Sequence, residues 1–232
     1  MNHDFKIPVL YQDEHIIAVE KPEGLPVHKN DFMPNDAPYL TKLLGNSTGK
    51  WIYNVHRLDS KTSGVIVLTF SSEMAHELTL QFERKEVMKK YMAIVQGNPG
   101  EGTFSDKVVV KKKSKFKKPA VTHFKTVKSV STGIEHKEAA NVVLSLVEIH
   151  PETGRWHQLR QHFAKNRFDM LGDTHHGDFK LNKIISEMTG IKRLFLHATE
   201  LEFAHPVTKE VLKITSVLPS EFESVFAAFE NS

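Results

Sequence analysis

The segment HRLDSKTSG, residues 56–64, places the carboxylate of Asp59 two residues after Arg57 and just ahead of an apolar run. A loop that leads into a buried strand is held firmly, so it can present a carboxylate to a substrate as a nucleophile or a general base. The spacing also fits an Asx-turn, in which Asp59 only accepts hydrogen bonds from the backbone of Thr62 and Ser63. Both readings stay open from the residues alone.

A second candidate segment is GRWHQLRQHFA, residues 154–164. On a helical wheel of about 100° per residue, Trp156, Leu159 and Phe163 form an apolar stripe. The wheel places Arg160 on the flank of this stripe and therefore partly inside the protein. The polar residues predicted to face away from the stripe are Arg155, Gln158 and His162.

A partly buried arginine needs a carboxylate, because its unpaired charge would be costly away from water. Asp59 is a physically reasonable partner for Arg160, since a guanidinium binds a carboxylate through two parallel hydrogen bonds. The alternative is an ion pair that serves the fold alone.

The segment GDTHHGD, residues 172–178, contains two aspartates and two adjacent histidines. Adjacent histidines on a strand or helix do not usually face one ion, and no established ligand spacing accompanies them. We therefore expect no metal site. The glycines and Asp173 instead predict a tight loop that lines a cleft.

Two further features bear on nucleic-acid binding. The run KKKSKFKK, Lys111 to Lys118, has six lysines in eight residues, which fits either phosphate binding or a solvated loop. Tyr91 lies on an alternating strand, where it either packs on the sheet or stacks on a base.

The elements that would position these residues alternate between strands and helices without a regular βαβ repeat, which predicts a largely antiparallel α+β sheet. Ser71 or Ser72 can cap the N-terminus of a helix. The apolar face of that helix would consist of Met74, Leu78 and Phe82. Strands are expected in 8–22, 65–70, 89–97, 121–130, 141–150, 194–203 and 211–215, and helices in 39–44, 72–82, 155–166, 179–188 and from Ser220.

Composition limits the classes of function. The 232 residues are 40% hydrophobic and 25% charged, with a net charge of +3, no cysteine and no long apolar run. A membrane protein, a disulfide framework and thiolate catalysis are excluded. The N-terminus shows no secretory signal, so we expect a cytoplasmic protein.

Five segments occur in the order and approximate spacing of the RluA-type pseudouridine synthases, and the chain resembles this family over about residues 7–217. These segments are AVEKPEGLPVH, HRLDSKTSG, KKYMAIVQG, ETGRWHQLRQHFA and RLFLHATELEFAHP. KPAVTHF and GDTHHGDFKLN are similar to its tRNA-modifying branch. The resemblance implies an α+β pseudouridine synthase fold, a largely antiparallel mixed sheet flanked by helices and loops around a central RNA-binding cleft. It also implies one catalytic domain, residues 1–232, without a separate N-terminal RNA-binding domain.

The resemblance further implies that Asp59 is the catalytic carboxylate, that Tyr91 packs on the target base and that Arg160 pairs with Asp59. Arg57 would enter the space left by a flipped uridine. The predicted substrate is tRNA, at the T-stem uridine 65, and the predicted state is a monomer without membrane or metal. No cofactor is required, because the isomerisation changes neither redox state nor atom count. The predicted RNA-binding residues are Arg57, His56, Lys21, Arg155, His157, Gln158, Lys111, Lys112 and Lys113.

Three alternatives remain at this stage. A ribosomal RNA synthase of the same family shares every catalytic segment. A non-catalytic RNA-binding module would keep the basic surface without needing Asp59, Tyr91 and Arg160 together. A metal-dependent hydrolase that uses the histidines and aspartates of residues 172–178 has the weakest support.

Overall fold

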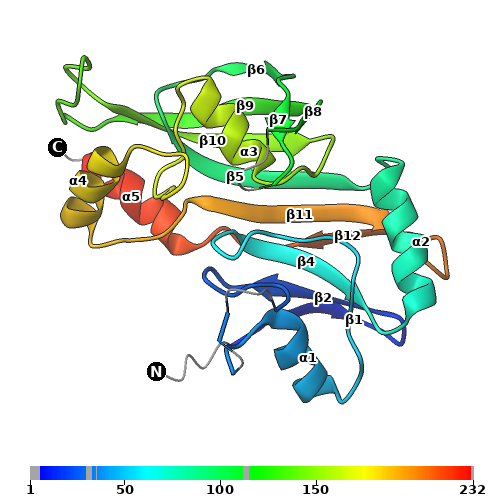
Figure 1. Ribbon diagram of the computed structural model, residues 1–232. Coiled ribbons are helices and arrows are strands. Elements are labelled where there is room, and N and C mark those ends of the chain that lie inside the picture. Colours follow the sequence, from blue (N-terminus) through cyan, green and yellow to red (C-terminus); the bar gives the residue numbers. More distant parts are fainter. Residues whose placement is uncertain (1–5, 30–32, 35, 112–114, 231–232) are drawn as a thin grey trace. The chain divides into compact units, whose positions relative to one another are not determined.

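The computed structural model describes residues 6–29, 33–34, 36–111 and 115–230, and it divides into two compact units (Figure 1). Unit 1 comprises Met1–Lys89 and Ala198–Val217, and unit 2 comprises Lys90–His197 and Leu218–Ser232. Each unit therefore draws on two separate stretches of the chain. The single catalytic domain expected over residues 1–232 stays a prediction. Lys112 and Lys113, two of the predicted RNA-binding residues, lie outside the described residues.

Unit 1 is built on the strand order β1-β2-β4-β11, with β3 paired to β4 and β12 paired to β11. The pairs β1–β2, β2–β4, β3–β4 and β11–β12 are antiparallel. Its elements are β1 (Val9–Gln12), β2 (Ile16–Lys21), α1 (Leu40–Thr48), β3 (Tyr53–Asn54), β4 (Ser63–Thr69), α2 (Ser72–Glu83), β12 (Val211–Thr215) and most of β11 (Leu196–Ala204).

The strands β2 and β4 form the centre of this unit. Every residue of β4 is buried, as expected for a continuous apolar run with neighbours on both sides. The helix α2 follows directly, and the hydroxyl of Ser71 accepts a hydrogen bond from the backbone N–H of Met74. This is the cap expected from the sequence, and it begins the helix within three residues of the strand end.

Residues from the end of the chain complete unit 1. The side-chain amide of Gln81 on α2 donates to the carbonyl of Ala204 at 2.8 Å, and its oxygen accepts from the N–H of Ala204 at 3.0 Å. The ring of His205 contacts the carboxylate of Asp13, with Nε2 and Oδ2 2.8 Å apart. These contacts join α2 and the turn between β1 and β2 to residues that follow them by more than a hundred positions.

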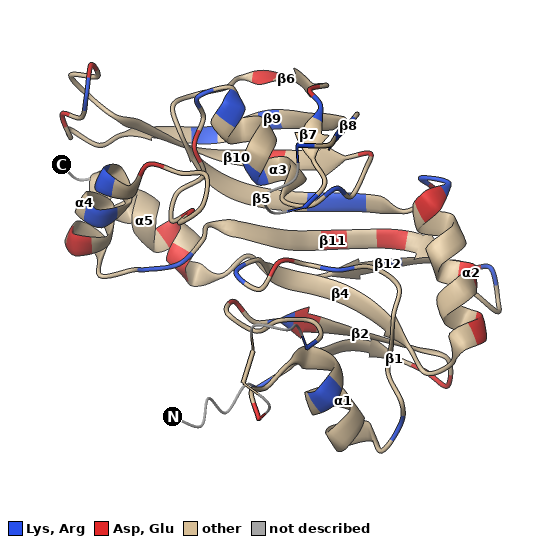
Figure 2. Ribbon diagram, viewed as in Figure 1, with Lys and Arg blue, Asp and Glu red and all other residues tan. Residues whose placement is uncertain are grey.

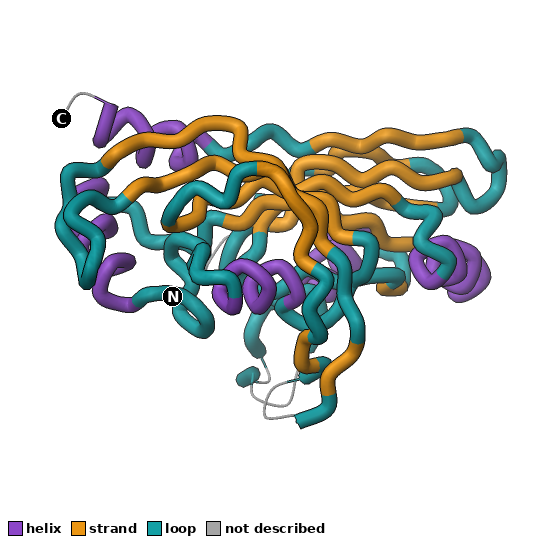
Figure 3. Tube along the Cα trace, turned by 90° about the horizontal axis from the view of Figure 1, so that it is seen from above, coloured by secondary structure: helices purple, strands orange, loops and turns teal. Residues whose placement is uncertain are grey.

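Unit 2 contains an antiparallel sheet in the order β5-β10-β9-β6 and a separate two-stranded ladder, β7–β8. Figure 3 shows its last helix, α5, as the purple segment that runs to the C-terminal label. The elements are β5 (Met88–Gln96), β6 (Glu101–Phe104), β7 (Val108–Val109), β8 (Lys117–Lys118), β9 (Thr122–Ser131), β10 (Val143–Pro151), α3 (Gln158–Lys165), α4 (Phe179–Thr189) and α5 (Ser220–Glu230).

Both faces of this sheet are covered, and alternate residues of β5 show it. Met92 and Ile94 belong to a core cluster that includes residues of α4 and α5. Ala93 and Val95 belong to a second cluster that includes Phe163 of α3. Because successive side chains of a strand point to opposite faces, α3 packs on one face and α4 and α5 pack on the other. The α+β prediction with mainly antiparallel pairing is confirmed.

The helix predicted over residues 155–166 begins three residues later than expected. His157 has left-handed backbone angles, φ 47° and ψ 28°, so helical geometry starts only at Gln158. Histidine tolerates this conformation better than β-branched residues do. Trp156 therefore lies before the helix and is not part of its apolar stripe. None of the helices in the described part of the chain is long and apolar enough to span a membrane.

Candidate functional site

The loop that carries Asp59 is fixed on one side by His56. The Nε2 atom of His56 accepts a hydrogen bond from the backbone N–H of Val67 in β4 at 3.1 Å, and the ring stacks on Phe82 of α2. Burial, together with the charge of Lys89, lowers the pKa of His56 to about 3. The ring is thus neutral at physiological pH and ties the loop to the adjacent strand and helix. The structure gives His56 this internal role, and because the residue is only half-buried, the RNA contact stays a prediction.

Lys21 fixes the same loop on its other side. Its side chain is fully buried, and the ammonium donates to the carbonyls of Pro22, Leu25 and Ser60 at 2.7–3.0 Å. A buried ammonium with these acceptors holds the loop in place. An RNA contact of Lys21 stays a prediction.

Asp59 itself lies at the first position of a turn, where its carbonyl accepts from the N–H of Thr62 at 3.0 Å. The residue is half-buried, whereas Arg57 is exposed. Gly64 follows at the start of β4 with φ +113°, and a Cβ there would lie 2.2 Å from the carbonyl oxygen of Ala198. The glycine is needed because β11 passes so close. A rigid loop thus presents one half-buried carboxylate and one exposed guanidinium.

In unit 2, Arg160 is buried and paired with Asp173. The Nε and Nη2 atoms of Arg160 each donate to a carboxylate oxygen of Asp173 at 2.7 Å, and the side chains are only 4% and 1% exposed. Burial alone would raise the pKa of Asp173, but the hydrogen bonds from Arg160 lower it to about 2. The expected carboxylate partner exists, and in this unit it is Asp173. An arginine has five N–H donors, so a further pairing with Asp59 stays a prediction.

Sequence reasoning missed the role of Asp173 because thirteen positions separate it from Arg160. The preceding Gly172 gives a partial signal, since it has φ +75° and a Cβ there would lie 1.6 Å from the carbonyl oxygen of Arg193. The sequence predicts that the glycines of this segment and Asp173 form a tight loop that lines a cleft. It is a tight turn, and it brings Asp173 beneath α3.

The polar residues of α3 do not follow the helical wheel. Gln158 and His162 were expected to face away from the core, but both are buried. The amide of Gln158 donates to Val121 and Thr122, and its oxygen accepts from Thr153 and Arg155. These bonds use its hydrogen-bonding capacity inside the protein, and an RNA contact of Gln158 stays a prediction.

His162 is likewise satisfied inside the protein. Its ring nitrogens lie 2.9 Å from the Thr122 hydroxyl and 2.9 Å from the carbonyl of Asp106. The helical wheel predicts Gln158 and His162 to be exposed, but β9 and the segment around Asp106 cover the face of α3 opposite the apolar stripe. Arg155, in contrast, is exposed as a predicted RNA-binding residue should be.

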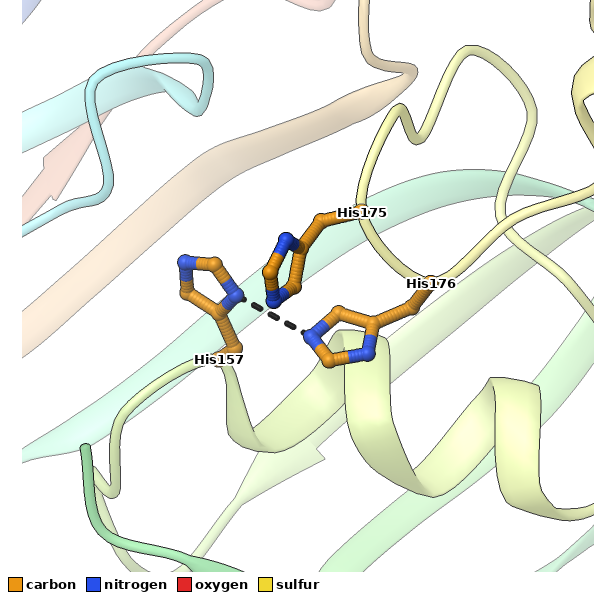
Figure 4. A group of neighbouring side chains, drawn as sticks. All are labelled: His157, His175 and His176. Atoms are coloured by element: carbon orange, nitrogen blue, oxygen red, sulfur yellow. Dashed lines mark hydrogen bonds between the residues drawn. The ribbon is translucent and has the colours of Figure 1, made fainter. Parts of the chain in front are cut away.

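Three histidines converge next to Arg160, and Figure 4 shows their rings facing a common point. One nitrogen each of His157, His175 and His176 lies within 4.8 Å of the other two. The Nδ1 atom of His157 is 3.1 Å from Nε2 of His176, and its Nε2 is 3.0 Å from Nη1 of Arg160. His175 and His176 lie in a turn, so the expectation for adjacent histidines on a strand or helix does not apply to them. Trp156 stacks on His157 with ring centroids 3.9 Å apart.

The charge state of this cluster follows from its surroundings. Burial lowers the pKa of His157 to about 3, with the Arg160 charge as the next cause. Burial also lowers the pKa of His176 to about 4. Both rings are therefore neutral imidazoles at physiological pH.

The structure also places Tyr91 and the described residues of the lysine run. Tyr91 on β5 is half-buried and packs against the cluster that contains Leu159 and Phe163 of α3. Lys111, Lys117 and Lys118 are exposed near the β7–β8 ladder. Figure 2 shows lysine and arginine segments among acidic ones in both units, so positive charge is not restricted to this ladder.

Comparison with known proteins identifies similar sequences and folds. A family model described as RNA pseudouridylate synthase matches residues 15–165. The chain is 36% identical to tRNA pseudouridine synthase C of Yersinia pestis, over 96% of this chain and 91% of that protein. It is 37% identical to tRNA pseudouridine synthase C of Pasteurella multocida, over 97% and 96%.

Two solved structures share the fold over nearly the whole chain. Human RNA pseudouridylate synthase domain containing 4 has a TM-score of 0.71 at 28% identity and covers 96% of this chain and 93% of that one. Human RNA pseudouridylate synthase domain containing 1 has a TM-score of 0.74 at 20% identity, with coverage of 97% and 88%. The second likeness concerns the fold alone.

Proposed function

The chain belongs to the RNA pseudouridylate synthase family, and we propose that it isomerises a uridine of tRNA to pseudouridine. The observation that carries this proposal is the match of 96–97% of the chain to relatives named tRNA pseudouridine synthase C. The T-stem uridine 65, expected from the sequence resemblance, is the position we propose. We also propose that the protein acts as a monomer in the cytoplasm.

Asp59 is the catalytic carboxylate in this proposal. Its loop is tied to β4 by His56 and to the segment after β2 by Lys21, so the carboxylate is held before substrate arrives. Such preorganisation lowers the cost of reaching a reactive geometry. The exposed Arg57 beside it is available to occupy the gap that a flipped base leaves, which offsets part of the unstacking cost.

Tyr91 and Arg160 complete the proposed machinery. Tyr91 offers an aromatic face to the target uracil, and Arg160 supplies a buried positive charge for the carboxylate of Asp59. Two routes remain for Asp59: attack on the ribose or the uracil ring, or removal of a proton that assists loss of the base. In either route the detached uracil rotates, bonds through C5 and loses the C5 hydrogen.

The rival substrate is ribosomal RNA, since its synthases share the catalytic segments. The names of the matched relatives favour tRNA. A non-catalytic RNA-binding role is a second rival, and it requires no ionised group at position 59.

The testing experiment measures tritium release from tRNA that contains 5-tritiated uridine. Wild-type protein is expected to release tritium from tRNA and not from ribosomal RNA. Asp59→Asn should bind tRNA within a few-fold of wild type but release tritium at least about a hundred times more slowly. Glu83→Gln, which neutralises an exposed carboxylate on α2 of the same unit, serves as the matched control. Comparable release by folded Asp59→Asn would reject the catalytic assignment.

A further inference from the structure

The hydrogen bond between Arg160 and His157 determines where His157 carries its proton. Nη1 of Arg160 lies 3.0 Å from Nε2 of His157, and a guanidinium has only donors. Nε2 of His157 must therefore accept, and the proton of the neutral ring must sit on Nδ1. That Nδ1–H then donates to Nε2 of His176 across 3.1 Å.

The remaining contacts close a ring of hydrogen bonds. The backbone N–H of His176 donates to Oδ1 of Asp173 at 3.0 Å, and Asp173 accepts both Nε and Nη2 of Arg160 at 2.7 Å. Asp173, Arg160, His157 and His176 thus form a closed cycle that engages both sides of the guanidinium. Each member restricts the rotation of the next.

The same geometry argues against a metal at the three histidines. A metal bound to Nδ1 of His157 would move the ring proton to Nε2, where it would point at the guanidinium of Arg160. Metal-bound histidines instead donate their second N–H to a carboxylate, a carbonyl or water. The cluster is therefore suited to hydrogen bonding.

We propose that His157 and His176 are positioning residues, which orient the guanidinium of Arg160 through a fixed His157 tautomer. The proposal rests on the proposed function, because it assumes that Arg160 supports uridine isomerisation. His157 acts directly on Arg160, and His176 acts through His157. His175 has its ring in the same cluster but is exposed. Its backbone N–H also donates to Oδ1 of Asp173, at 2.7 Å, but its side chain is not one of the links of the cycle.

The tautomer can be tested without any substrate. Nitrogen-15 NMR of imidazole-labelled protein at neutral pH should show His157 with a protonated Nδ1 and an unprotonated Nε2. An Nε2–H tautomer, or a charged ring, would overturn the proposal. This measurement decides the hydrogen-bond chain whatever RNA the protein modifies.

The kinetic test compares three variants in the tritium-release assay. His176→Ala should lower kcat about tenfold, with KM for tRNA near the wild-type value, because binding surface is retained. His176→Gln should restore most of kcat, since its amide oxygen can accept the His157 proton. His175→Ala, the matched control, should keep wild-type kcat.

The outcomes separate the two proposals. Wild-type kcat in His176→Ala, or no rescue by His176→Gln in folded protein, would overturn the positioning role. An equal loss in His175→Ala would also overturn it, because a metal or general packing would explain that result. If wild-type protein fails to act on tRNA, the proposed function falls while the NMR result still tests the cycle.

Discussion

The guanidinium of Arg160 and the carboxylate of Asp173 meet through two hydrogen bonds, each 2.7 Å long, beneath α3. Both groups are almost completely buried, so neither charge has water as a substitute partner. Removing one partner would leave the other charge uncompensated.

Asp173→Asn should therefore lower the free energy of unfolding by about 3 kcal/mol or more. Urea unfolding at neutral pH measures this change. The control is Glu187→Gln, which removes the carboxylate of an exposed pair with Lys183 at 3.7 Å. It should cost less than about 0.5 kcal/mol. Similar costs for the two variants would show that burial of the Arg160 pair carries no penalty.

Stability should fall on acidification below about pH 6.5 because of His56. Its pKa is 6.5 in the unfolded chain and about 3 in the folded protein, so only the unfolded state gains a proton between these values. The stabilisation is present above pH 6.5 and is lost progressively towards pH 3, at up to about 1.4 kcal/mol per pH unit. Unfolding free energies measured from pH 7.5 to 5 should show a smaller pH dependence in His56→Gln. The exposed His76 on α2 provides the control, and His76→Gln should follow wild type.

Gly172→Ala should destabilise the protein more than its backbone angle alone explains. Gly172 and Gly133 both have positive φ, +75° and +69°, but only at Gly172 would a Cβ meet another chain segment. Gly133→Ala should cost about 1 kcal/mol from conformation, and Gly172→Ala about 3 kcal/mol or more from the added clash with Arg193. Equal melting temperatures for the two variants would contradict this account.

The lysines around the β7–β8 ladder should contribute phosphate affinity that does not depend on sequence. Replacing Lys111, Lys117 and Lys118 by serine should flatten the dependence of log K for tRNA on log salt by about 0.7–0.9 per lost phosphate contact. Turnover at saturating tRNA should remain near wild type. The triple variant Lys180→Ser, Lys183→Ser and Lys192→Ser removes the same charge from exposed positions elsewhere in unit 2. An equally reduced salt dependence of tRNA binding in both triple variants would show that tRNA affinity depends on the net charge of the protein and not on the position of these lysines.

The regular elements were predictable where the pattern is local. The apolar run of β4 and the Ser71 cap of α2 each depend on neighbouring residues, and each is confirmed. The strand β5 is also confirmed, but Met92–Val95 are all buried, because both faces of the sheet are covered. The start of α3 was not predictable, because the left-handed backbone conformation of His157 leaves no mark in the spacing of apolar residues, and its ring contacts Arg160 and His176. Local periodicity contains no information about such contacts.

The candidate site was predictable in its residue types and only partly in its contacts. The need of Arg160 for a carboxylate follows from burial, but Asp173 is brought to it by the close passage of Gly172 past Arg193. The family resemblance implies an RNA contact for Lys21, whereas the side chain is fully buried. Its ammonium is satisfied by the carbonyls of Pro22 and Leu25 from the segment that follows it and by that of Ser60 from the Asp59 loop, 39 positions away.

The discontinuous composition of unit 1 has a consequence for synthesis. Its first 89 residues leave the ribosome early, but Gln81 and Asp13 find their partners Ala204 and His205 only after the whole of β5 to α4 has been translated. The partners of these contacts are 123 and 192 positions apart in the sequence. Contacts between such distant residues favour slow folding, because the chain between them must first be brought together. We therefore expect the apolar strand β4 to stay incompletely covered until its neighbour β11 has been synthesised.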